Sequence, residues 1–342
     1  MTAPAAERSV AGIELVETRP LVLPGLVAWF ELAPGDRALI AAGDAIAAGA
    51  PLAERLRDPR LAEAAAHRDD ARRPGERIAG ASGHRPSLRR AQHPAGELLY
   101  AAGGRWRLAT GELIDPLEAP ASGIVREVVP GSGIAVGFGG HALAGVLGLG
   151  GPARGRLALA TDASGEVRPA AIDVGRSGTI LVVGARVDAE TLTRARAMGV
   201  RGIVTASLGA KDLRDFSASE TRQRAALHRL PPLAVLVLEG AVRRPISGPA
   251  MAVLAALAGA EVAIVSDPPA LLFEASEAAA IVPPPGWVRV RGGPWVGREG
   301  RFEGLVGPRR FAAGTHLEAG LVRFEDGAAP TVLPLADLER FV

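Results

Sequence analysis

Cysteine is absent from this chain of 342 residues. Its absence excludes structural disulfides, zinc sites built from thiolates, iron–sulfur clusters and cysteine nucleophiles. The chain also has one lysine, Lys211, two glutamines and no asparagine. A function that needs a reactive lysine at any other position is therefore excluded as well.

A strong excess of charge of either sign is also absent. Lysine and arginine together number 39 against 37 aspartates and glutamates, which leaves a net charge of +2 at pH 7. Such a balance permits a nucleic-acid partner without indicating one. Because 48% of the residues are hydrophobic, a chain of this length can build two or three domains, each with its own core.

Residues 131–151 contain no Asp, Glu, Lys or Arg. The length of this stretch alone would suggest a membrane span. Its many glycines instead predict buried strands joined by tight turns. Residues 1–20 lack the basic start and apolar run of a signal peptide. We therefore expect a cytoplasmic protein without a membrane segment.

Familiar catalytic motifs are missing too. The sequence holds no Gly-Lys-Ser/Thr of a phosphate-binding loop and no Gly-x-Ser-x-Gly nucleophile elbow. The six histidines are scattered along the chain, which argues against a metal site. We expect no cofactor, no metal and no catalytic residues, and the sequence does not indicate an enzyme.

Composition divides the chain into three regions, and the fold class they predict is mixed β and α/β. Residues 1–152 have short apolar runs without helical spacing, which favours β structure. Within them, residues 55–94 are polar and arginine-rich, which predicts an exposed insertion whose first part could form a short helix. Residues 153–284 alternate between strand and helix patterns, and residues 285–342 return to β character.

The middle region predicts an α/β domain. Strands are expected at 178–185, 200–206, 231–240 and 260–266, and helices at 188–199 and 247–259. This alternation is typical of a mostly parallel sheet covered by helices, and the segment 180–216 resembles swivelling α/β domains. Ligands of such sheets bind at the carboxyl ends of the strands. The candidate ligand residues there are Lys211, Asp212 and Glu239.

Two motifs in the first region resemble the halves of a barrel-sandwich hybrid. Residues 38–56 place Gly43-Asp44 at a tight turn and Gly49 at a second turn, and in residues 117–134 Ala119-Pro120 precedes a strand. The order of the halves is similar to that of RnfC-type electron-transport subunits. The resemblance implies the fold alone, because residues 1–210 lack the lysine of a biotinyl or lipoyl carrier and the chain lacks the cysteines of that electron-transport family.

The last region resembles the KOW motif of ribosomal proteins and NusG-type transcription factors, followed by the rest of an SH3-like barrel. Val288 and Val290 alternate inward, Gly292-Gly293-Pro294 turns, and Gly297 and Gly300 precede Phe302. Asp326-Gly327 predicts a hairpin turn, and residues 335–342 a short helical turn. The sequence departs from the family at Val296, where a basic residue is common. The resemblance implies RNA, the ribosome, RNA polymerase or another protein as partner.

Arginines gather in this last region. Six stand between 288 and 310 against two glutamates, a local excess suited to phosphate contact. Over 286–342, however, eight arginines face seven acids, so a packing module with arginines for solubility is the opposing interpretation. The candidate contact residues are Arg289, Arg291, Trp295, Arg298, Arg301, Arg309 and Arg310.

We therefore predict a non-enzymatic binding or scaffold protein that contacts RNA, the ribosome or the transcription apparatus through its KOW-like barrel. One alternative is a small-molecule-binding or regulatory protein with its ligand in the α/β domain. Another is an assembly protein that uses both barrels for oligomerisation. The sequence leaves the oligomeric state open.

Overall fold

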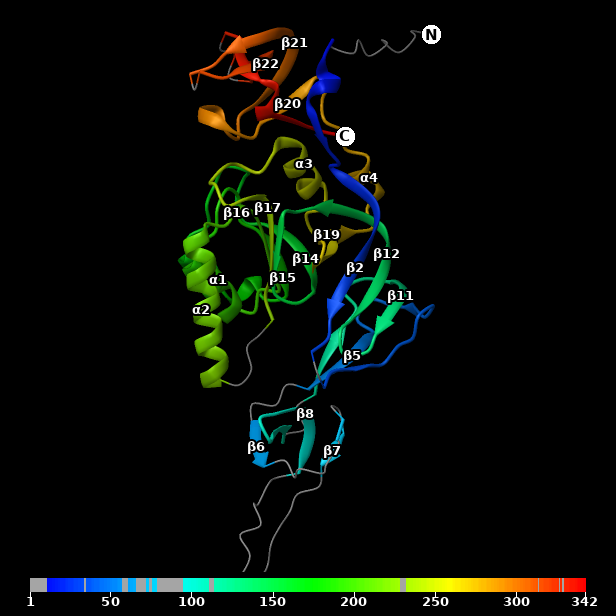
Figure 1. Ribbon diagram of the computed structural model, residues 1–342. Coiled ribbons are helices and arrows are strands. Elements are labelled where there is room, and N and C mark those ends of the chain that lie inside the picture. The colour runs from blue at the N-terminus through cyan, green and yellow to red at the C-terminus, as the bar shows by residue number, and fades with distance from the viewer. Residues whose placement is uncertain are drawn as a thin grey trace, which may run out of the picture. The chain divides into compact units, whose positions relative to one another are not determined.

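The computed structural model describes residues 11–342 except 34, 57–60, 66–71, 74–75, 79–94, 111–113, 228–231, 313, 326 and 328. The chain is mostly β, with several sheets and few helices (Figure 1), as the mixed β and α/β composition predicts. It forms two compact units. One unit holds the residues up to Pro24 with 140–216 and 233–342, and the other holds 25–139 with 217–232.

Four parallel strands form the centre of the sheet in the first unit. They lie side by side in chain order: β14 (Ala153–Leu159), β15 (Thr179–Val182), β16 (Gly202–Ser207) and β17 (Ala234–Gly240). The flanking strands pair antiparallel: β13 (Leu147–Leu149), β18 (Glu261–Ser266), β19 (Pro269–Phe273) and the end of β12 (Gly133–Ala144). The prediction of a mostly parallel sheet therefore holds for the centre, but the whole sheet is mixed.

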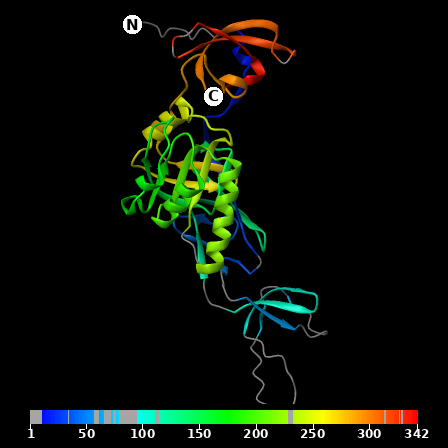
Figure 2. The ribbon, with the colours of Figure 1, turned by 90° about the vertical axis from the view of Figure 1, so that its left-hand side faces the viewer.

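Helices cover both faces of this sheet. The helices are α1 (Ala189–Ala197), α2 (Ala210–Leu227), α3 (Gly248–Ala256) and the short α4 (Ser276–Ala279). Helix α1 starts as predicted, because the Asp188 carboxylate accepts a hydrogen bond from the Thr191 amide at 2.7 Å. Helix α2, which the strand–helix pattern did not reveal, lies in front of the strands in Figure 2.

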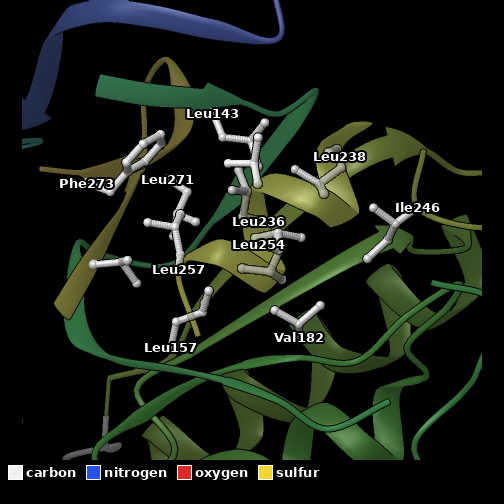
Figure 3. Close-up of a cluster of buried hydrophobic side chains, with 14 of the residues drawn as sticks. Leu143, Leu157, Val182, Leu236, Leu238, Ile246, Leu254, Leu257, Leu271 and Phe273 are labelled. Carbon is white, nitrogen blue, oxygen red and sulfur yellow. The ribbon is translucent and has the colours of Figure 1, made fainter. Parts of the chain in front are cut away.

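The two faces bury different side chains. Leu192 of α1 and Phe216 of α2 belong to one apolar cluster, with inward side chains of β15 to β17. Leu254 and Leu257 lie in another cluster on the opposite face, around Leu236 (Figure 3). The loop after β16 therefore leads to a helix on one face, and the loop after β17 leads to a helix on the other.

A six-stranded sheet, here called the terminal sheet, also belongs to this first unit. Its strands are, in order, β1 (Glu17–Arg19), β24 (Leu338–Phe341), β20 (Trp287–Val290), β21 (Glu299–Arg310), β22 (His316–Phe324) and β23 (Thr331–Pro334). Val288 and Val290 lie in its core, as predicted, together with Phe302. The strand β1, from the other end of the chain, pairs in parallel with β24.

Two details at the end of the chain differ from the sequence-based expectations. The helical turn covers only Leu335–Asp337, and the residues after it form β24. Of the predicted Asp326-Gly327 turn, Asp326 lies outside the described residues.

The second unit contains the predicted glycine turns of the first region. Gly43 and Gly49 have φ angles of 94° and 81°, a conformation that favours glycine. The Asp44 carboxylate closes the first turn by accepting a hydrogen bond from the Ala41 amide at 2.7 Å. The strands are β2 (Val22–Glu31), β3 (Arg37–Ala38), β4 (Ala45–Ile46), β5 (Pro51–Leu56), β10 (Ile114–Glu118), β11 (Gly123–Val129) and the start of β12.

Residues of the predicted insertion form a small sheet together with the segment that follows it. Its strands are β6 (Leu61–Ala65), β7 (Arg77–Ile78), β8 (Gly96–Ala102) and β9 (Arg105–Ala109). They enclose a core that includes Leu98, Trp106 and Leu108. The expected short helix at the start of the insertion is wrong, because residues 61–65 pair with β9 as a strand. Much of the predicted segment 55–94 lies outside the described residues.

Residues 131–151 form strands β12 and β13, as their glycine content predicted. In the part of the chain that the structure describes, no helix combines the length and the apolar character needed to cross a bilayer.

Candidate functional site

The predicted contact residues of the terminal sheet lie in different environments. Arg289 is buried, with 0% of its surface exposed. It therefore cannot belong to a surface that touches an outside partner, and its inclusion among the contact residues is wrong. The alternation rule failed here because both faces of β20 are covered: Val288 and Val290 face the core of the terminal sheet, and Arg289 faces the loop after β17.

Arg289 forms a buried ion pair with Glu239, at the carboxyl end of β17. The Arg289 Nη1 lies 2.5 Å from the Glu239 Oε1, and both side chains are at most 1% exposed. The Arg289 Nη2 donates to the Pro245 carbonyl at 2.6 Å. The Ser247 amide donates to the same Glu239 oxygen at 3.4 Å. Glu239, predicted as a ligand residue, is thus occupied by an arginine of the same chain.

Two further arginines lie beside Glu239. Arg19 of β1 donates to the Leu238 carbonyl at 3.1 Å and approaches the Glu239 carboxylate at 4.0 Å. Arg244 donates to the Glu239 carbonyl at 2.5 Å. Burial lowers the pKa of Arg244, while the negative charge of Glu239 opposes that change. These charged side chains form a buried network where the terminal sheet meets the loop after β17. This part of the terminal sheet is here called its base.

Glu299 joins this network from the start of β21. Its carboxylate accepts hydrogen bonds from the Gly248 amide at 2.9 and 3.1 Å and from the Trp287 Nε1 at 3.3 Å. Its Oε1 lies 3.7 Å from the Arg289 Nε. Burial raises the pKa of Glu299, and the Gly248 hydrogen bond and the charge of Arg289 act in the opposite direction.

Trp295 and Arg298 form a stacked group on the terminal sheet. The Arg298 guanidinium lies 4.0 Å from the centre of the Phe324 ring and 5.1 Å from that of Trp295. The two rings are 5.7 Å apart. Trp295 remains 38% exposed, so part of its ring can still contact a partner. Arg291 is engaged differently, in an ion pair with Glu17 and a hydrogen bond to the Ala336 carbonyl at 3.1 Å.

Arg309 and Arg310 lie at the far end of the β21–β22 hairpin. Both are exposed, and Arg310 faces the exposed His316 across the ribbon. Arg309 donates to the carbonyl of its neighbour Pro308, at 3.1 Å. Arg301, also exposed, lies on the outer face opposite Arg323. Within the described residues, no carboxylate forms an ion pair with Arg301, Arg309 or Arg310.

The two other predicted ligand residues lie at the start of α2. Asp212 is 8% exposed and pairs with Arg186, whose Nη2 is 2.7 Å away. Lys211 pairs one turn along the helix with Asp215, also at 2.7 Å. The hydrogen bond that Arg186 donates to the Asp212 carboxylate raises the pKa of Arg186, and the one that Lys211 donates to the Asp215 carboxylate raises the pKa of Lys211. Glu239 instead pairs with Arg289 and Arg19. The ion pairs therefore do not join the three predicted ligand residues into one site.

Sequence reasoning missed Glu299, Arg19 and Arg244 as members of one site. Arg19 and Glu299 contact residues 219 and 51 positions away along the chain, which a local pattern does not reveal. Arg244 lies in a loop only five residues from Glu239. One signal was present: Arg243-Arg244 and Ser247-Gly248 stand between a buried strand and a helix, where polar groups commonly converge.

Groups of three or more His, Asp or Glu side chains able to hold a metal ion are absent from the described part of the chain. A scan against protein-family models finds no match to this chain, and a search of curated proteins finds none either.

Proposed function

We propose that this chain is a non-enzymatic binding or scaffold protein, and that its terminal sheet acts as a KOW-like, SH3-like barrel that contacts RNA, the ribosome or the transcription apparatus. The observation behind this proposal is the adjacent exposed pair Arg309 and Arg310, which has no carboxylate partner among the described residues. Arginine binds phosphate with a planar, bidentate geometry.

The hairpin geometry supports a contact along a phosphate backbone. Neighbouring residues of a strand point to opposite faces, so Arg309 and Arg310 can reach phosphates on both sides of the ribbon. Arg301 adds a third exposed guanidinium on the outer face. Trp295 offers a partly exposed ring for stacking on a base.

The experiment that tests this proposal compares R309E/R310E with the wild type. We expect the wild-type protein, purified at low salt, to retain nucleic acid that a high-salt wash removes, because phosphate contacts are sensitive to salt. The double variant should lose that retention. The measurement is the 260/280 nm absorbance ratio before and after the wash.

R168E/R201E is the matched control, because it makes the same change in charge with two exposed arginines outside the terminal sheet. Equal loss of retention in both variants would show a dependence on net charge alone. A clean wild-type protein at low salt would reject RNA as the partner. Replacing Arg298 and Arg301 is a less direct test, since Arg298 also packs on Phe324.

A second candidate is a small-molecule site at the carboxyl edge of the central strands. The observation that favours it is the divergence of the loops after β16 and β17 toward helices on opposite faces, the position where α/β sheets commonly bind ligands. Lys211 and Asp212 lie at the start of α2, directly after the first of these loops. Native mass spectrometry of the purified protein tests it, because a retained ligand adds a defined mass.

A further inference from the structure

The first amide of helix α3, that of Gly248, has no hydrogen-bond acceptor within the helix or in the side chain that precedes it. The side chain of Ser247, which precedes the helix, makes no capping hydrogen bond. The first amides of a helix have no acceptor within the helix, and Pro249 has no N–H to offer. The Gly248 amide must therefore find its acceptor elsewhere.

That acceptor is Glu299, 51 residues further along the chain and on the terminal sheet. Both carboxylate oxygens lie within 3.1 Å of the Gly248 amide. A negative charge at this end of a helix is also favoured by the helix dipole. Trp287 and Arg289 hold the same carboxylate from the side of the terminal sheet.

Apolar packing surrounds these polar contacts. Trp287 and Phe341 of the terminal sheet stack with ring centres 5.3 Å apart. Both belong to the same buried cluster as Ile246 and Ala250, at the start of α3. The loop between β17 and α3 is thus held against the terminal sheet by apolar contact, by the Arg289 ion pair and by the Glu299 hydrogen bonds.

We propose that Glu299 is a carboxylate latch, an internal ligand at the start of α3 that makes the terminal sheet and this helix open together. The exposed end of the hairpin is then held on a fixed support, although the Pro-Pro-Pro-Gly run at 283–286 has the composition of a linker between separate domains. This inference goes beyond the proposed function, because it holds whether or not the hairpin binds RNA.

The test uses the full chain and the amide hydrogen exchange of Gly248, measured by NMR. In E299A we expect exchange at Gly248 to accelerate about fivefold or more, the equivalent of losing a cap worth about 1 kcal/mol. Sodium formate should restore most of the protection, because it can enter the space left by the carboxylate. Sodium chloride at the same ionic strength should not.

E303A is the matched control, since Glu303 lies on the same strand and pairs with Arg323 instead; it should leave the exchange at Gly248 unchanged. E299Q keeps an oxygen acceptor, so it should retain most of the protection. Unchanged exchange in E299A would overturn the latch, and so would acceleration that formate reverses no better than chloride.

If E299A does not fold, the wild type still decides the question. The amides of Gly248 and of Val288 in β20 should exchange through one opening, with the same dependence on denaturant. Opening of the terminal sheet at a lower free energy, with Gly248 still protected, would reject the latch.

Discussion

Arginines at the base of the terminal sheet and at the end of its β21–β22 hairpin lie in opposite environments. At the base, Arg289 of the neighbouring strand is fully buried and paired with Glu239. At the end, Arg309 and Arg310 are exposed and have no acidic partner among the described residues. An arginine at the base therefore holds the fold together, whereas an arginine at the end is available to a partner.

This contrast changes the meaning of the arginine excess between 288 and 310. Packing accounts for Arg289, and intramolecular pairing and stacking account for Arg291 and Arg298. The opposing interpretation of this region as a packing module therefore describes its base, while the binding proposal concerns its end. The predictions below separate the two roles.

The largest effect is expected at the base. Replacing Arg289 with Met removes the nearest cation from the buried Glu239 and leaves it the longer approach of Arg19, at 4.0 Å. Breaking a buried pair in this way typically costs about 3–5 kcal/mol of unfolding free energy. Chemical denaturation measures this loss. R323M is the matched control, because Arg323 forms a partly exposed pair with Glu303, and exposed pairs contribute about 1 kcal/mol or less. Similar losses in the two variants would show that burial does not distinguish them.

A smaller effect is expected at the end of the hairpin. If Arg309 and Arg310 each contact a phosphate, R309A and R310A should each lower the slope of log affinity against log salt by roughly 0.7, the value for single strands. Fluorescence anisotropy with a single-stranded RNA oligonucleotide measures this slope. R291A should change it less, because Arg291 pairs with Glu17. An equal change in R291A would contradict the assignment of contacts to the hairpin end.

The smallest effect concerns pH. Burial raises the pKa of Glu299 above its ordinary value, so the folded protein binds this proton more tightly than the unfolded chain does. The resulting stabilisation is complete below the unfolded pKa, near 4.5, and is lost as pH rises through the folded pKa. Compared with E299Q, the wild type should therefore gain stability as pH falls through this range.

Thermal unfolding of both proteins at a series of pH values from 7 down to 4 measures the difference. Arg289 and Glu325 are the charged groups that act on Glu299, the first lowering and the second raising its pKa. A wild type that loses stability relative to E299Q on acidification would show that the hydrogen bonds and Arg289 outweigh burial.

Local patterns predicted several elements correctly. Asp188 caps α1 and Gly199 follows it with φ of 78°, because capping and left-handed turns depend on a few neighbouring residues. The apolar runs also predicted β15, β16, β17 and β18, but they did not predict the central strand β14 or the strand β19. Helix α2 was not predictable, since its polar sequence is anchored to the sheet by few residues, among them Phe216.

The buried network at the base was not predictable, for a physical reason. A strand pattern shows which residues share a face, but it does not show what covers that face. Arg289 alternates with two inward valines and would be solvated in a free sheet. It is buried because the loop after β17 supplies Glu239 and the Pro245 carbonyl.

The sequence by itself determined the mixed β and α/β character, the exclusion of cysteine chemistry and the positions of the main glycine turns. These properties depend on composition and on neighbouring residues. Only the tertiary structure decided which arginines are buried, that Glu299 caps α3, and that a strand near the N-terminus completes the terminal sheet. Those outcomes depend on contacts between residues tens to hundreds of positions apart, which a local pattern does not specify.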